Sequence, residues 1–535
     1  MIDTQVLIVG AGPVGLTLAL DLGQRGVRCT LIERNETSIQ LPKMERCNAR
    51  TMEIFRRMGL ASKVRAAGLR ADAPMDVFLV LDCVRPPLLR FPFPSVAEFT
   101  EIIAKTTDGS QPLEPYQLIS QYTVEPLLKA QAETLPSVSV RFGYELLSFE
   151  QDAEQVTAHV KALDGTISTI RAKYLAACDG GASVVRRQLG IKLSGEANIL
   201  ELRQALYHCE DLYQRIPIGK GRHYHCVDAE GSFLIVQDST RHFTLHAVVE
   251  NDADMARQFE KVVAMPVTYQ MLYVGKWRMN LLLADRYQEG RVFMAGDAVH
   301  LVIPTGGLGM NSGVGDAIDL SWKLAATLQG WGGPGLLAAY ETERRTVGHN
   351  NVQASTYASL GRRKWRAMYR PEMRERTPAG DAARAELIKV ADVEQRKSNE
   401  MVGAELAYHY AGSPLIWPEQ GAPPYDFREY VPTTFPGVRL PHVWLKDGTA
   451  MQDRIGYDHG YTLLRLGGAA ADAAGVARAF AAYGAPFRVL DVDDAHARAV
   501  YGYDLILLRP DMHIVWRGLH APEQPQRLVA VATGH

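Results

Sequence analysis

The first residues suited to chemistry are the glycines of Gly10-Ala-Gly-Pro-Val-Gly15, whose spacing is that of a nucleotide-binding turn. Residues 5–9 before them are rich in β-branched side chains and predict a buried strand, and residues 16–22 predict the helix that follows. Residues 27–32 predict a second strand, which ends at Glu33. Such a turn lets the backbone approach a pyrophosphate at the helix N-terminus, and the terminal acid accepts hydrogen bonds from a ribose. A purely structural glycine turn is the alternative, which the register of strand, helix and acid disfavours.

Residues 292–328 form a second segment with a clear chemical meaning. Residues 292–295 predict a strand, Gly296-Asp297 a turn, and residues 313–328 a helix that begins after the glycine-rich loop 306–311. A carboxylate suits the hydroxyls of a ribityl chain, and a helix N-terminus suits a ring system that becomes anionic on reduction. Asp297 and the loop supply these two features, so the segment favours FAD over NAD.

A third segment lies between the other two: residues 174–178 predict a strand that runs into the turn Asp179-Gly180. The three motifs, in this order, resemble the class A flavoprotein aromatic hydroxylases, the group that includes 4-hydroxybenzoate hydroxylase and phenol hydroxylase. The resemblance covers about residues 1–350. It implies an α/β fold, in which a Rossmann-like FAD-binding domain is interrupted by an antiparallel β-sheet substrate domain.

The resemblance also assigns residues to the cofactor. The glycines of the first motif and Glu33 would hold the ADP half of FAD, Asp297 the ribityl chain, and residues 309–311 the isoalloxazine ring. The segment at Asp179 is linked in the family to both FAD and NAD(P)H. The full set expected to bind FAD is Gly10, Gly12, Pro13, Val14, Gly15, Glu33, Arg34, Lys43, Gln121, Asp179, Gly180, Gly296, Asp297, Gly307, Gly309, Met310 and Asn311.

Lys43 departs from the family pattern. The family commonly has an arginine seven residues before the arginine of its Arg-Thr-Met-Glu helix start, which is Arg50-Thr-Met-Glu53 in this chain. Lysine keeps the positive charge but loses the planar fork that makes bidentate contacts. Chlorophenol-type members of the family resemble this sequence in having lysine there, and Arg46 is close enough to substitute. We therefore still expect FAD to bind.

The motifs divide the chain into segments that alternate between two domains. Residues 223–226, 232–237 and 242–249 predict strands of the substrate sheet, and residues 348–402 predict helices with polar faces. Residues 412–438 are crowded with Pro, Gly and Tyr and predict a linker. We expect FAD-binding segments at 1–68, 116–180 and 277–400, substrate-domain segments at 69–115 and 181–276, a linker at 401–438 and a C-terminal domain at 439–535.

The C-terminal domain has a pattern of its own. Residues 442–445, 461–465, 487–491, 505–509 and 513–517 predict strands, and residues 476–483 a helix among them. The pattern resembles the thioredoxin-like C-terminal domain of phenol hydroxylase and of polyketide hydroxylases such as aklavinone hydroxylase. All six cysteines precede residue 227, so this domain has no thiol for redox chemistry. We expect a structural or dimerisation role.

The substrate contacts are sought on the predicted substrate strands and beside the flavin. A histidine suits the acceptance of a phenolic proton, and alternation along the strand puts His223 and His225 on one face. Pro304, in the loop beside the ring, would offer a backbone carbonyl as its family counterpart does. The alternative is that these residues cap strand ends or face solvent. The candidates are His223, Tyr224, His225, His246 and Pro304, with Tyr207, His208 and Tyr273 as similar ones, Glu45 and Arg46 as a charged relay, and His300 orienting its loop.

The resemblance implies a reaction. In this class NAD(P)H reduces the flavin, O2 adds at C4a, and the resulting hydroperoxide transfers oxygen to an electron-rich ring. We expect an FAD-dependent monooxygenase that hydroxylates a phenol, with NAD(P)H as a transient co-substrate, because no second nucleotide fingerprint occurs. Two alternatives stay open: a Baeyer–Villiger or epoxidising polyketide-tailoring flavoenzyme, and a flavin-binding interaction protein without turnover. The motifs do not separate phenol degradation from antibiotic biosynthesis, and we expect a simple phenol.

Composition excludes several other classes of protein. The 535 residues are 47% hydrophobic and 22% charged with a net charge of −2, which argues against nucleic acid or an anionic membrane as the main partner. The six cysteines include no Cys-x-x-Cys pair and no metal-type spacing, a pattern typical of a reducing compartment. No apolar run reaches the roughly 20 residues of a membrane span. We expect a cytoplasmic protein without a metal, forming a homodimer as class A relatives often do.

Overall fold

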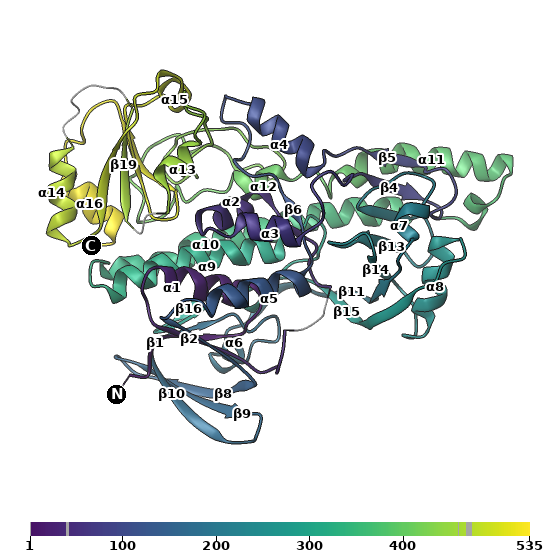
Figure 1. The fold of residues 1–535 in the computed structure, drawn as a ribbon, viewed down its shortest axis with the longest axis horizontal. Helices are drawn as coiled ribbons and strands as arrows, with labels where there is room; N and C mark the ends of the chain where they lie inside the picture. Colours follow the sequence, from purple (N-terminus) through teal and green to yellow (C-terminus); the bar gives the residue numbers. More distant parts are fainter. Residues whose placement is uncertain (1, 39–41, 458–459, 467–472) are drawn as a thin grey trace.

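Three sheets of four or more strands organise residues 2–38, 42–457, 460–466 and 473–535, which this computed structural model describes (Figure 1). One sheet carries the glycine motifs, one forms the substrate domain, and one belongs to the C-terminal domain. In Figure 1 the C-terminal domain, in yellow, and the substrate sheet, in teal, lie at opposite ends of the molecule. Among the described residues, no helix is long and apolar enough to cross a membrane.

The first sheet has a parallel centre in the order β17-β10-β1-β2-β7. Val6, Leu7 and Ile8 of β1 are fully buried, because β1 lies between β10 and β2 and α1 packs against it. A hairpin, β8 and β9, extends the sheet beyond β10. The strands are β1 (Thr4–Val9), β2 (Cys29–Glu33), β7 (Val138–Phe142), β8 (Tyr144–Gln151), β9 (Val156–Ala162), β10 (Ile167–Ala177), β16 (Gln288–Glu289) and β17 (Val292–Met294).

Helices α1 (Pro13–Gln24), α5 (Gln121–Ala132) and α9 (Gly309–Leu328) pack together over this sheet. The strand–turn–helix–strand order predicted for the first motif is confirmed. Helix α9 begins at Gly309, four residues before the predicted start. The first glycine-rich residues are therefore helical and do not belong to the loop. The turns that follow the C-terminal ends of β1, β10 and β17 are therefore directed toward the N-termini of α1 and α9.

The substrate sheet has the order β18-β15-β11-β14-β13-β12-β4-β5. Its neighbours are antiparallel except for β12 and β4, which are parallel. The boundary expected at residue 276 falls inside β15, and β18 brings residues 300–301 into this sheet as well. The strands are β4 (Val77–Val80), β5 (Leu89–Phe91), β11 (Leu193–His208), β12 (His223–Cys226), β13 (Phe233–Val236), β14 (His242–Ala247), β15 (Gln270–Ala284) and β18 (His300–Leu301).

Helix α10 (Pro334–Arg366) joins the parts of the molecule. Its 33 residues span about 50 Å at 1.5 Å per residue. It packs against α9, α11 (Pro378–Arg396) and β15, so one rigid element touches both main domains. The polar helices predicted for residues 348–402 are thus present.

The C-terminal sheet has the order β20-β19-β21-β22, with β19 and β20 parallel and the other pairs antiparallel. This is the thioredoxin-like arrangement. The strand predicted at 442–445 is absent: only Trp444 forms an isolated bridge, to Ala450, because the backbone there turns back on itself through Leu445 N–H to the Thr449 carbonyl at 2.8 Å. The elements are β19 (Tyr461–Arg465), α14 (Ala474–Ala482), β20 (Phe487–Asp491), α15 (Ala495–Tyr501), β21 (Leu505–Leu508), β22 (Ile514–Gly518) and α16 (Pro525–Thr533).

Shorter elements complete the described fold. Two of them matter for the site: β3 pairs with β6 beside the FAD-binding segments, and the 3-10 turn η1 follows β17. These elements are β3 (Arg46–Cys47), α2 (Ala49–Arg57), α3 (Ala61–Ala67), α4 (Val96–Lys105), β6 (Gln117–Leu118), α6 (Val184–Gln188), α7 (Leu212–Arg215), α8 (Asp254–Val263), η1 (Gly296–Ala298), η2 (Pro371–Arg374), α12 (Val402–Leu406) and α13 (Met451–Ile455).

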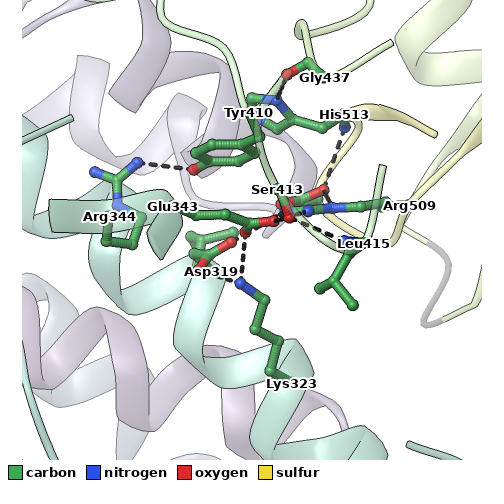
Figure 2. A network of polar contacts seen from close by, with 12 residues as sticks. Asp319, Lys323, Glu343, Arg344, Tyr410, Ser413, Leu415, Gly437, Arg509 and His513 are labelled. Carbon is green, nitrogen blue, oxygen red and sulfur yellow. Dashed lines mark hydrogen bonds and ion pairs between the residues drawn. The ribbon is translucent and has the colours of Figure 1, made fainter. Parts of the chain in front are cut away.

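A buried network of charged side chains joins the C-terminal domain to α9 and α10 (Figure 2). Arg509 binds Glu343 of α10 at 2.6 Å and Asp319 of α9 at 3.0 Å. Lys323 binds the same two carboxylates, and Asp511 binds Arg509 at 2.5 Å. Burial raises the pKa of Asp319; Lys323 and Arg509 oppose the rise, and Glu343 adds to it. Because these groups have little contact with water, the cations and carboxyl groups are stabilised mainly by one another.

Candidate active site

A cavity of about 670 Å³ runs from the turn after β1 to the face of the substrate sheet. Both domains and helix α10 contribute to its wall. Of the residues expected to hold FAD, those that line it are Gly10, Gly12, Pro13, Val14, Glu33, Arg34, Lys43, Gln121, Asp179, Gly180, Asp297, Gly307, Gly309, Met310 and Asn311. Gly15, in the first turn of α1, and Gly296, in η1, lie behind this surface.

Each of the three glycines of the first motif is required for a different physical reason. Gly10 has a φ of +103°, and a Cβ there would lie 2.4 Å from the Cys178 carbonyl oxygen. A Cβ on Gly15 would lie 2.0 Å from the Gly10 carbonyl oxygen, so both positions are fixed by close backbone packing. At Gly12 the nearest atom would be Glu125 Oε1 at 3.9 Å. The open space at Gly12 faces the cavity, which is what close approach of a phosphate requires.

The N-terminus of α1 has no side-chain cap and no acidic residue in its first turn. Orphan N–H groups at such an end need partners, and an anion supplies them. Glu33 closes the other side of the turn: its Oε2 accepts from Ala11 N–H at 2.9 Å and its Oε1 from Asn35 N–H at 3.0 Å. Glu33 Oε1 also accepts from Asn35 Nδ2 at 2.5 Å. These contacts fix the carboxylate at the end of β2, while Oε2 keeps a lone pair for a ribose hydroxyl.

One carboxylate oxygen of Asp179 accepts hydrogen bonds from the protein, and the other is left for a ligand. Its Oδ2 accepts from the N–H groups of Val184 at 2.8 Å and Val185 at 3.3 Å, at the start of α6. Its Oδ1 is buried without a hydrogen-bond partner among the described residues. Burial raises the pKa of this carboxyl, and the hydrogen bonds to α6 oppose the rise. An acceptor of this kind needs a donor from a ligand.

The second half of the FAD wall is the loop before α9. The Gly296 N–H donates to Asp316 Oδ2 at 3.0 Å, and His300 Nε2 lies 2.8 Å from the same oxygen. His300 therefore orients this loop, as expected from its sequence position. Asp297 stands exposed in η1 at the cavity wall. Asn311 ties the loop to β3, because its Nδ2 donates to the carbonyl of Arg46 at 3.1 Å.

Glu125, on α5, is a cavity residue that the sequence prediction missed. Its Oε1 accepts from Gln121 Nε2 at 2.6 Å, one turn earlier on the same helix. Burial raises its pKa to about 7, although the Gln121 hydrogen bond and Lys43 oppose the rise. Its spacing of four residues from Gln121 is the signal that could have identified it.

The residues present fit a bound FAD. Open space at Gly12, uncapped N-termini of α1 and α9, the unpartnered Asp179 Oδ1 and the exposed Asp297 are complementary to phosphates, hydroxyls and a reducible ring. Lys43 lines the same cavity with its positive charge.

The substrate end of the cavity contains a histidine–carboxylate pair. His223 Nε2 lies 2.7 Å from Glu45 Oε1, while His223 Nδ1 has no hydrogen-bond partner among the described side chains. Burial lowers the pKa of His223 to about 4, against the raising effect of Glu45. For Glu45, burial would raise the pKa, but His223, Arg222 and Arg46 together lower it to about 2. At neutral pH the pair is therefore a neutral imidazole and a carboxylate, so Nε2 carries the hydrogen and Nδ1 the lone pair.

The other predicted substrate residues divide into two groups. His246 and Pro304 line the cavity with His223. His225 shares the strand face of His223, as alternation predicts, but stacks on Phe233 with ring centroids 4.1 Å apart and is not in the cavity wall. Tyr224 points to the opposite face, where its hydroxyl donates to the Gly219 carbonyl at 3.0 Å. Tyr207, His208 and Tyr273 are also outside the wall.

Several wall residues were missed by the sequence prediction. Phe233, Ile235 and Gln237 alternate along β13 and its end, and this period of two was the available signal. Arg46 was expected in a relay and instead binds Glu405 at 3.1 Å and the Gly306 carbonyl at 3.1 Å. Others come from distant parts of the chain, where local pattern gives no signal. These are Arg222, Trp277, Arg362 and Asn399.

Comparison with known proteins agrees with this geometry. Residues 3–355 match the family described as FAD binding domain, and residues 433–534 match the family described as aromatic-ring hydroxylase, C-terminal. This chain belongs to the FAD-dependent aromatic-ring hydroxylases. The hydroxylase is thus an enzyme, a flavin-dependent monooxygenase with FAD as its cofactor, and the alternative of a flavin-binding protein without turnover is set aside.

Relatives of the hydroxylase span its whole length. It is 30% identical to FAD-dependent monooxygenase apdD of Emericella nidulans, over 99% of this chain and 90% of that protein. It is also 30% identical to 4-methyl-5-nitrocatechol 5-monooxygenase of Burkholderia sp, over 98% and 96% of the two chains. The structure of RebC with bound 7-carboxy-K252c is similar with a TM-score of 0.90 at 31% identity, covering 100% and 99%. That of aklavinone-11 hydroxylase with FAD and aklavinone has a TM-score of 0.84 at 26% identity, covering both chains fully.

Proposed function

We propose that the hydroxylase inserts one atom of O2 into a phenolic ring, with NAD(P)H as the reductant. The observation that carries this proposal is the unpartnered Nδ1 of His223, a residue that lines the cavity together with residues that fit a flavin. When bound, FAD would accept electrons from NAD(P)H and activate O2. The protein must bind the ring, exclude water and prepare the phenol for attack.

His223 is the group that prepares the phenol. Its Nε2–H is held by Glu45, so Nδ1 is the only ring nitrogen that accepts a phenolic proton. Transfer of that proton leaves a phenolate, which is richer in electrons ortho and para to its oxygen. Glu45 stabilises the imidazolium that forms, as the carboxylate of a catalytic triad does.

A pKa of about 4 makes His223 a weak base for a phenol, whose pKa is near 10. The difference must be offset by stabilising the phenolate. The guanidinium group of Arg222 lines the same cavity and lowers the pKa of His223 as well. Its positive charge favours an anion beside His223 and so makes the transfer feasible.

The proposed substrate class is a hydroxylated aromatic ring. Its support comes from the relatives, whose names include an aklavinone hydroxylase and a nitrocatechol monooxygenase. The second name specifies a catechol, which is a phenolic ring. The cavity offers Phe233, His246 and Trp277 as flat partners for such a ring.

The test is NAD(P)H oxidation by the FAD-loaded enzyme over a panel of simple and polycyclic phenols, with peroxide measured alongside. We expect strong stimulation by a phenol with little peroxide. Failure of every phenol to stimulate a reducible flavin would contradict the proposal and favour a ketone or alkene substrate. The methyl ethers of the same phenols are the matched controls, because they lack the proton that His223 accepts.

A further inference from the structure

Two arginines at the substrate end of the cavity have no carboxylate partner among the described residues. Arg222 is 5% exposed, and within the same part of the chain its side chain makes only one polar contact, a weak one from Nη2 to Asn399 Oδ1 at 3.4 Å. Its Nε is buried without a partner there. Arg362 of α10 has neither a hydrogen bond nor an ion pair within the described ranges, and its Nε is likewise buried and unpartnered. Buried guanidinium donors without partners are costly, so a ligand is expected to satisfy them.

Positive charge is in excess at this end of the cavity. Arg46 is paired with Glu405, as described above. Glu45 is the carboxylate that acts electrostatically on both Arg222 and Arg362, and its Oε1 already binds His223. Burial and the positive charge of the neighbouring Arg366 lower the pKa of Arg362 to about 9, against the raising effect of Glu45. Three guanidinium groups thus share two carboxylates among the described side chains of this wall.

An aromatic side chain places the unpaired cation next to the catalytic histidine. The guanidinium carbon of Arg362 lies over the Phe233 ring, 5.1 Å from its centroid. The His223 ring lies edge-on to the same phenyl ring with centroids 4.9 Å apart. A single substrate ring can therefore reach His223 with one substituent and Arg362 with another.

We propose that the substrate of this enzyme carries a carboxylate in addition to its phenol, and that Arg362 binds that carboxylate, which leaves Arg222 for the phenolate. The proposal rests on the proposed function, because it concerns the same cavity. A guanidinium fork matches a carboxylate in two parallel hydrogen bonds, and the bound anion neutralises the excess charge. Arg362 then sets which end of the substrate faces His223.

The test compares hydroxybenzoic and hydroxyphenylpropionic acids with their methyl esters, in the wild-type holoenzyme and in Arg362→Met. We expect KM for the best acid to be at least about tenfold below that of its ester in the wild type, a difference of about 1.4 kcal/mol. Arg362→Met should remove this preference by weakening the acid alone. Arg362→Lys should keep part of it, because the charge stays. Arg363→Met, at the exposed next position of α10, is the matched control and should change nothing.

A second readout does not need turnover. Benzoate and benzamide differ in charge, and their binding is followed by the change in the flavin absorbance. Benzoate should bind the wild type and Arg363→Met but not Arg362→Met, whereas benzamide should bind none of them well.

Equal binding of benzoate to Arg362→Met and wild type would overturn the carboxylate site even if the hydroxylase reaction stands. An equal loss for acid and ester would also overturn it, since Arg362 would then serve the phenolate. If benzoate binds as expected and no phenol is oxidised, the inference stands and the proposed function fails.

Discussion

At the scale of single residues, the proposed chemistry depends on the pair of His223 and Glu45. Their 2.7 Å contact fixes one tautomer of the imidazole, and the unpartnered Nδ1 is the proposed acceptor of the phenolic proton. The sequence indicated His223 as one of several histidines on substrate strands. It did not single it out, because the contact with Glu45 joins residues 178 positions apart.

Replacement of His223 by Gln should lower kcat/KM by about 10²-fold, the lower range for loss of a general base. FAD affinity should stay the same, because His223 lies at the substrate end of the cavity. Steady-state kinetics and flavin fluorescence titration measure the two effects. His242→Gln is the control on the same sheet, since His242 is not in the cavity wall and should tolerate the change. Unchanged kcat/KM in His223→Gln would remove this residue from the mechanism.

The pH dependence follows from burial of the same residue. Because burial holds the pKa of His223 at about 4, the imidazole is neutral throughout the range from pH 5.5 to 8. We expect kcat/KM for a phenol to show no histidine titration near the ordinary value of about 6.5. Its acid limb should fall near pH 4. An inflection near pH 6.5 that disappears in His223→Gln would show that the histidine is not buried as described.

At the scale of elements, two glycines of the motif after β1 serve different purposes, one for folding and one for binding FAD. A Cβ at Gly15 would overlap the Gly10 carbonyl oxygen at 2.0 Å, whereas one at Gly12 would project into open cavity. Gly15→Ala should therefore destabilise the fold by at least about 1–3 kcal/mol, as overpacking does. Gly12→Ala should keep the apoprotein melting temperature and weaken FAD binding by roughly tenfold, or about 1.4 kcal/mol. Thermal melts of the apoprotein and FAD titrations distinguish the two, and equal effects of both substitutions would contradict the assignment.

The elements themselves were largely predictable where the pattern is local. Strands β12, β19 and β20 have the bounds that alternation and β-branched residues predict. Residues 442–445 have a similar pattern but no neighbouring strand edge, so their backbone hydrogen bonds go to a local turn. The start of α9 was missed because its glycines are typical of loops; in the structure Gly313 lies inside the helix, where a Cβ would be 2.4 Å from Val14. Strand propensity is thus decided by available partners.

At the scale of the whole molecule, the C-terminal domain is tied to the FAD-binding helices through Arg509 (Figure 2). Helix α9 both contributes Asp319 to this network and presents its N-terminus to the flavin site. Similarly, Arg362 reaches the substrate end of the cavity only because α10 spans the molecule. Such contacts join residues far apart in sequence, which is why the FAD motifs could be predicted and the substrate wall largely could not.

Arg509→Met should destabilise the protein by about 3–5 kcal/mol, because it leaves Glu343 and Asp511 buried with too little positive charge. Chemical denaturation of the FAD-loaded enzyme measures this effect. Arg498→Met removes a half-exposed ion pair with Asp504 in the same domain and should cost no more than about 1 kcal/mol. A similar small cost for Arg509→Met would mean that the network does not hold the domains together.

The most direct test of the central claim is the fate of oxygen during turnover of the best phenol under isotopically heavy O2. We expect mass spectrometry to find one heavy oxygen atom on the aromatic ring of the product, with one NAD(P)H consumed for each product molecule. The same product formed without label, or label found only in peroxide or inserted beside a carbonyl carbon, would contradict aromatic hydroxylation as the reaction of this enzyme.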